Sequence, residues 1–196
     1  MSFTYWRDLA VLTVSNPSLA ARELMAMGFA RNVLWQALFL VALLNTIIFA
    51  VSDMLVARAA SLPGFSQSPF VLFGMVAGGL IVTIYSIFWA GRLLGGKAAV
   101  ADLMVLIIWL QALRLVVQGA ALVLVLTVPF LSVLLVFGAS LLGLYILLNF
   151  INKAHQLGSI ARSAAVLVVS MMVFVLGLSL FFGLIGLPVM GSAAHV

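Results

Sequence analysis

Residues 103–150 read LMVLIIWLQALRLVVQGAALVLVLTVPFLSVLLVFGASLLGLYILLNF, a run of 48 residues in which Arg114 is the one charged side chain. A helix needs about 20 apolar residues to cross a bilayer, so this run is too long for one span. Pro129 lies close to its middle, and proline removes a backbone donor and disfavours helix at the residue before it. The run therefore predicts two transmembrane helices, at 103–126 and 130–150, joined by a very tight hairpin.

The composition of the whole chain also indicates a membrane protein. Of its 196 residues, 66% are hydrophobic and 7% are charged, whereas about a quarter of a soluble domain is charged. Four acids and nine bases are too few to cover a soluble globule, so most of the exterior must face hydrocarbon. The net charge of +5 does not indicate nucleic-acid binding, because the bases are scattered singly. The absence of cysteine excludes disulfides and thiolate metal sites.

Three further apolar runs complete the prediction of an all-α, polytopic protein with five transmembrane helices. They cover residues 33–51, 69–90 and 164–187. The segment 57–68 contains Pro63, Gly64 and three serines, so we expect a turn-rich loop there. The first thirty residues hold no uninterrupted apolar segment, and we expect no cleavable signal peptide. The expected organisation is an N-terminal segment at 1–31, a single transmembrane domain at 32–190 and a short external tail at 191–196.

Lysine and arginine are distributed unevenly between the two sides of this arrangement. Seven fall on one side: Arg7, Arg22, Arg31, Arg92, Lys97, Lys153 and Arg162. Arg58 alone falls on the other side. Because cytoplasmic loops retain an excess of basic residues, we expect a cytoplasmic N-terminus and an external C-terminus. Without a turn at Pro129 the asymmetry would weaken to five against three, so the charge pattern also favours five spans.

The segment before the first span contains a helix start at Ser15-Asn16-Pro17, with Asn16 as the N-cap and Pro17 at the first helical position. A short amphipathic helix is predicted to run from there to about Arg31. It would lie in the headgroup plane or pack on the bundle as a lead-in helix, and the aromatic residues at positions 3, 5 and 6 favour the first placement. Its predicted apolar face comprises Leu19, Ala20, Leu24, Met27 and Ala30.

Arg114 is the least expected residue of the chain, because a charge halfway through a span is costly. Gln111, Arg114 and Gln118 share one helix face, which must line the bundle interior or a wet cavity. Asp53 and Asp102 lie near span ends, too far along the helices to pair with Arg114. Two interpretations stay open: Arg114 is a structural residue bonded to carbonyls or reaching an interface, or it binds an anion or lipid phosphate. The expected protein partners are Asn45, Thr83, Tyr85 and Ser86.

The remaining polar residues predict no enzyme, metal site or cofactor. His155 and His195 fall on opposite sides of the membrane, whereas zinc needs three or four convergent ligands. We expect His155 to be solvated in the loop after the fourth span. No G-x-S-x-G turn, carboxylate pair or complete phosphate-binding loop occurs. Pairs of small residues are expected to let helices approach closely within the bundle. They are Gly74 with Gly78 and Ala139 with Gly143.

Three features together resemble the bacterial branch of the Yip1 family. They are Asn16-Pro17 opening a helix before the first span, the loop Leu94-Gly95-Gly96-Lys97-Ala98-Ala99, and the five-span layout itself. The resemblance implies an all-helical domain that acts in binding or membrane organisation rather than catalysis, in the bacterial inner membrane. Eukaryotic relatives are associated with small GTPases and vesicle traffic. This chain lacks their long N-terminal region and their Asp-Leu-Tyr-Gly-Pro-like segment, which argues against a GTPase-binding role.

The sequence therefore predicts a non-enzymatic membrane protein that binds lipid, another membrane protein or a second copy of itself. The expected contacts to anionic headgroups are Arg92, Lys97, Lys153 and Arg162. The competing prediction is a small transporter or channel in which Gln111, Arg114 and Gln118 line a solute path. Transporters usually show broken helices or an inverted repeat, and this sequence shows no convincing internal repeat.

Overall fold

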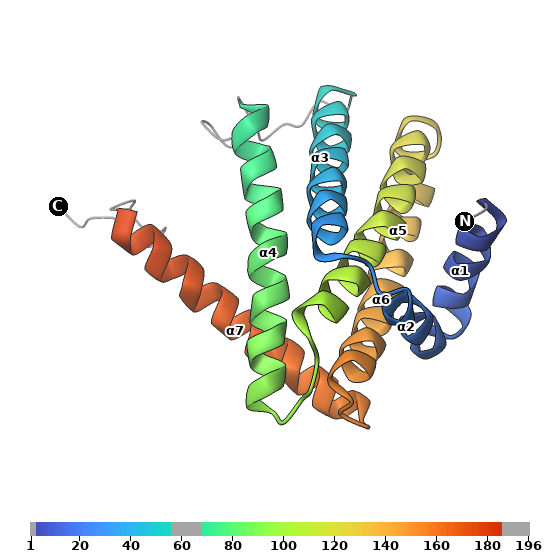
Figure 1. Ribbon diagram of the computed structural model, residues 1–196. Helices are drawn as coiled ribbons and strands as arrows, with labels where there is room; N and C mark the ends of the chain where they lie inside the picture. Colours follow the sequence, from blue (N-terminus) through green and yellow to red (C-terminus); the bar gives the residue numbers. More distant parts are fainter. Residues whose placement is uncertain (1–2, 56–67, 186–196) are drawn as a thin grey trace.

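The computed structural model describes residues 3–55 and 68–185, and within them the chain is entirely helical (Figure 1). The helices are α1 (Phe3–Ser15), α2 (Pro17–Ala26), α3 (Arg31–Leu55), α4 (Pro69–Leu93), α5 (Val100–Thr127), α6 (Pro129–His155) and α7 (Ile160–Ile185). Five of them, α3 to α7, contain segments long and apolar enough to cross a membrane. The prediction of an all-α protein with five candidate spans is confirmed, and α3, α5 and α6 are longer than predicted at both ends.

The hairpin between α5 and α6 is as tight as Pro129 predicts. Val128 is the one residue between the two helices, with extended backbone angles, and Pro129 occupies the first position of α6. The missing N–H of proline costs nothing there, because the first N–H groups of a helix have no partner in the helix. The Ser132 hydroxyl donates to the Ala121 carbonyl at 3.0 Å and ties the start of α6 to α5.

The predicted N-terminal helix begins where expected but ends earlier. The Asn16 side chain accepts a hydrogen bond from the Leu19 N–H at 3.1 Å, which confirms it as the N-cap of α2. The helix stops at Ala26 rather than near Arg31, because Gly28 takes a φ of +58°, a conformation that glycine adopts readily. On the predicted apolar face Ala20 and Leu24 are buried, whereas Leu19 is exposed. Placement in the headgroup plane stays a prediction.

α1 was not predicted, and it packs on the bundle through two contacts with Trp109 of α5. The Trp109 indole N–H donates to the buried Thr13 hydroxyl at 2.9 Å, and the rings of Trp6 and Trp109 lie 5.6 Å apart. α2 continues this docking, since Ser18 donates to the Asn149 side-chain oxygen on α6 at 3.0 Å. The pair α1–α2 is therefore attached to α5 and α6 by hydrogen bonds as well as apolar contact.

Most of the apolar core lies in one half of the bundle. The buried residues come mainly from α1 and α2, from the first halves of α3, α5 and α7, and from α4 and the second half of α6. Examples are Leu38, Ile87, Leu103, Phe150 and Val166. In the opposite half, which contains the turn at Val128, few side chains are buried. We call that half the turn half.

The prediction of close helix contacts at pairs of small residues is wrong for the glycines. A Cβ added to Gly74, Gly78 or Gly143 would meet no neighbouring atom within 4 Å among the described residues. These glycines lie on surfaces that face away from other helices or toward open space. The close contacts within the chain occur instead at Gly91 and Gly96.

Candidate functional site

The end of the bundle opposite the turn half is organised around His155. Its side chain is the last of α6 and is 1% exposed, so the prediction of a solvated loop histidine is wrong. The imidazole lies against two glycines from the end of α4 and the following loop, Gly91 and Gly96. A Cβ at Gly91 would overlap the ring, and one at Gly96 would lie 2.7 Å from the His155 Cβ and Cγ. Only glycine leaves room for the imidazole at these two positions.

The contact between His155 and the two glycines holds the α4–α5 loop next to the α6–α7 connection. The Lys97 N–H donates to the His155 carbonyl at 3.1 Å, which docks the α4–α5 loop on the end of α6. Gln156 then takes a left-handed conformation, with a φ of 56°, and ends the helix. The Arg162 guanidinium donates to the Leu157 carbonyl at 3.4 Å. The loop 94–99 and the connection 156–159 therefore form one joint.

Four basic residues surround this joint, and they are the ones predicted to meet anionic headgroups. Arg92, Lys97 and Arg162 are exposed, and Lys153 is half-buried. The Arg92 guanidinium lies 5.3 Å from the centre of the Phe88 ring. Within the described ranges, the one salt bridge joins Arg7 to Asp8, so no acid neutralises any of the four. We call this set of four residues the basic end.

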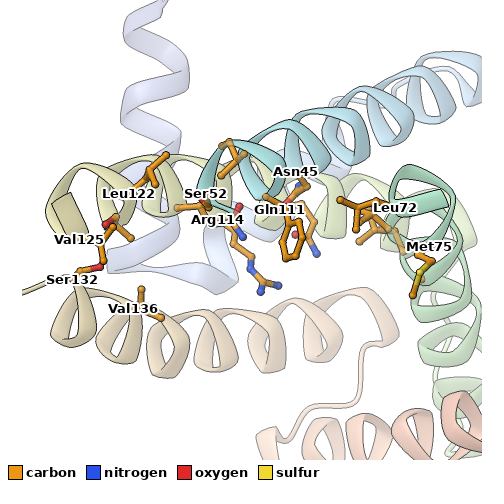
Figure 2. A pocket seen from close by; sticks show the side chains of 17 residues that line it. Asn45, Ser52, Leu72, Met75, Gln111, Arg114, Leu122, Val125, Ser132 and Val136 are labelled. Carbon is orange, nitrogen blue, oxygen red and sulfur yellow. The ribbon is translucent and has the colours of Figure 1, made fainter. Parts of the chain in front are cut away.

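A cavity of about 710 Å³ occupies the turn half, between α3, α4, α5 and α6 (Figure 2). Seventeen residues line it, and eleven of them are apolar. The polar ones are Asn45, Ser52, Gln111, Arg114, Gln118 and Ser132. The structure thus brings the whole predicted stripe of Gln111, Arg114 and Gln118 to one cavity. Figure 2 shows the Arg114 side chain extending from α5 into this space toward α6.

Arg114 has no protein partner among the described residues. It forms no hydrogen bond, salt bridge or ring contact with them. Of its four expected partners, only Asn45 lines the cavity, and its amide donates to the Val41 carbonyl at 2.9 Å. The Thr83 hydroxyl donates to the Gly79 carbonyl at 2.7 Å, and Thr83, Tyr85 and Ser86 are not among the lining residues.

Gln118 adds a second unsatisfied group to the cavity. Its side-chain oxygen is buried and accepts no hydrogen bond in the described structure. A buried acceptor without a donor costs about 1–3 kcal/mol, so a ligand that supplies an O–H or N–H here would be stabilised. Among the described residues, the cavity therefore offers a cation and an acceptor without partners in a mostly apolar lining.

Sequence reasoning missed two features of these sites. The contact between His155 and the two glycines joins positions about 60 residues apart, and no periodic pattern links them. The cavity depends on how far helices separate, which hydropathy does not encode. In the parts of the chain that the structure describes, no group of three or more His, Cys, Asp or Glu residues could hold a metal ion.

Comparison with known families agrees with this architecture. The Yip1 domain matches residues 11–193, which is nearly the whole chain. No curated protein and no solved structure matches the chain. The match includes α2, all five candidate spans and both sites described above. The chain therefore belongs to the Yip1 family.

Proposed function

We propose that this protein is a non-enzymatic lipid-binding protein of the Yip1 family, with a role in membrane organisation or as an accessory to another membrane protein. The observation that carries the proposal is the basic end, where four uncompensated bases surround the joint built on His155. Because that joint fixes two connections side by side, the charges have a defined spacing rather than a random one. A surface of this kind attracts anionic headgroups and partners with acidic segments.

The strength of the proposed interaction follows from the number of charges. A basic residue close to an anionic leaflet contributes about 1 kcal/mol, so four together exceed the 1.4 kcal/mol that corresponds to a tenfold change in affinity. The backbone of Lys97 is held by its N–H bond to the His155 carbonyl, and the Arg162 guanidinium is held by its bond to the Leu157 carbonyl. Little conformational entropy is therefore lost when they meet a headgroup.

A variant of the basic end tests this proposal. We expect replacement of Arg92, Lys97, Lys153 and Arg162 with Gln to weaken retention of anionic lipid at least tenfold in native mass spectrometry, because the removed charges supply the attraction. Arg58→Gln is the matched control, since the sequence predicts Arg58 on the other side of the membrane, and it should leave retention nearly unchanged. Equal retention by the wild type and the fourfold variant would remove the proposal.

The proposed orientation places the basic end in the cytoplasm, in a bacterial inner membrane. The support is the excess of lysine and arginine at that end. Because the natural chain has no cysteine, single cysteines report on each side without background. We expect Lys97→Cys to react with a membrane-impermeant maleimide only in inverted vesicles, and Arg58→Cys only in intact cells. The reverse pattern of labelling would contradict the orientation.

A further inference from the structure

Among the described residues, no acidic side chain compensates the charge of Arg114. α5 runs from Val100 to Thr127, so Arg114 lies about 20 Å from either end of the helix at 1.5 Å per residue. A guanidinium at that depth in a membrane needs a partner or water. None of the four acids supplies it: Asp8 pairs with Arg7, Asp102 accepts from the Ala99 N–H at 3.3 Å, and neither Glu23 nor Asp53 lines the cavity. The described residues therefore leave the Arg114 guanidinium open to a partner from outside them.

The side chains around Arg114 define the chemistry of that partner. The planar guanidinium donates in a fork that suits phosphate oxygens. The Gln118 oxygen is buried and has no donor among the described residues, so it can accept from a hydroxyl or amine hydrogen on a ligand. Both groups lie on α5 and line the same cavity. An anionic phosphate next to a free hydroxyl satisfies both.

The remaining lining indicates a lipid rather than a free ion. Eleven of the seventeen lining residues are apolar, and at about 710 Å³ the cavity is within the range of sites for small molecules. A hydrated inorganic anion would leave that apolar surface in contact with water. Acyl chains would cover it, for example at Leu72, Met75 and Val136.

The position of the cavity favours binding over passage. Its lining comes from the last turns of α3, the first half of α4, the second half of α5 and the start of α6, all in the turn half. The other half of the bundle is filled by the packed core, for example by Leu38, Ile87 and Leu106. The cavity therefore ends inside the protein rather than continuing across it.

We propose that this cavity binds one anionic phospholipid with a hydroxyl-bearing headgroup, whose phosphate pairs with Arg114 and whose hydroxyl donates to Gln118. The acyl chains lie against the apolar lining. This site lies in the turn half, at the opposite end of the bundle from the basic end. It can therefore be tested independently of the function proposed above.

Native mass spectrometry of the full-length protein with the basic end already replaced by Gln isolates this site. Phosphatidylglycerol is the probe, with phosphatidylcholine and phosphatidylmethanol of the same chains as references. We expect one phosphatidylglycerol to remain bound, and Arg114→Gln to weaken its binding on the order of tenfold, as loss of a charged hydrogen bond does. Gln118→Leu should lower phosphatidylglycerol binding to the level of phosphatidylmethanol, which has the charge but no hydroxyl.

A second measurement does not depend on a charge variant. Val136 lines the cavity, and Val136→Cys would be the sole cysteine of the chain. We expect phosphatidylglycerol to slow its modification by a small maleimide at least fivefold, while phosphatidylcholine and inorganic phosphate leave the rate unchanged. Equal protection by inorganic phosphate, or phosphate flux in proteoliposomes that Arg114→Gln abolishes, would overturn the lipid site in favour of an anion path. Unchanged phosphatidylglycerol binding in Arg114→Gln would also overturn it.

Discussion

Replacement of Gly91 with Ala is expected to destabilise the protein by about 1–3 kcal/mol, the usual cost of an added methyl group in a well-packed site. The new Cβ would overlap the His155 ring, which is 1% exposed. Either the imidazole leaves its site or the end of α4 moves away from α6. The free energy of unfolding measured by titration with a denaturing detergent checks this expectation.

The matched control is Gly78→Ala in the same helix. No atom lies within 4 Å of a Cβ added there, so the free energy of unfolding should not fall and should rise by at most about 1 kcal/mol, the helix preference for Ala over Gly. Comparison of the two variants separates the clash from the general effect of replacing a helical glycine by alanine. A similar loss of stability in Gly91→Ala and Gly78→Ala would show that the contact with His155 is not its cause.

A double-mutant cycle then tests whether the loss of stability comes from the contact between Gly91 and His155. His155→Ala empties the space that the new methyl group would enter, so Gly91→Ala should cost less in that background than in the wild type. We expect a coupling of at least about 1 kcal/mol between the two positions. Additive effects would contradict a direct contact between Gly91 and His155.

Trp109→Ala is expected to release α1 from the bundle. The variant loses the ring pair with Trp6 and the hydrogen bond to Thr13, each worth about 1 kcal/mol, and together on the order of 2 kcal/mol. Local opening of α1 should then increase roughly thirtyfold, since 1.4 kcal/mol corresponds to a factor of ten. Hydrogen exchange of the amides of residues 6–15 measures this opening directly.

Two further variants show which contact of Trp109 protects α1 from hydrogen exchange. Trp109→Phe keeps an aromatic ring opposite Trp6 but cannot donate to Thr13, so exchange should rise only about fivefold. Trp89→Ala removes a tryptophan that is 60% exposed on α4 and should leave exchange in α1 unchanged. Unchanged protection in Trp109→Ala would mean that α1 is held by other contacts.

The architecture could be predicted because each span is specified locally. An apolar run of the right length, a proline or a capping residue at its start and a charge or glycine at its end act through neighbours in the sequence. Asn16 caps α2 as predicted, and Pro129 marks the predicted break between two spans, although it is the first residue of α6 rather than part of the turn. α1 escaped prediction because it is too short to span a membrane and is held by a contact with the distant Trp109.

The candidate sites could be predicted only in part. The spacing of Gln111, Arg114 and Gln118 placed them on one face of α5, and in the structure all three line the same cavity. The basic residues were predicted to share one side, but nothing in their spacing showed that a joint would fix them. His155 was misplaced because an isolated histidine near a helix end carries no signal of burial, whereas its partners are glycines far away in sequence.

The sequence by itself determined the class of protein, the number of its spans and the residues that would carry charge, because hydropathy and helix signals act over short distances. The tertiary structure decided where those charges meet and what surrounds them. It places a packed core in one half of the bundle and a cavity with an unpaired arginine in the other. That division depends on how closely helices approach one another, which is set by side chains from four different helices at once.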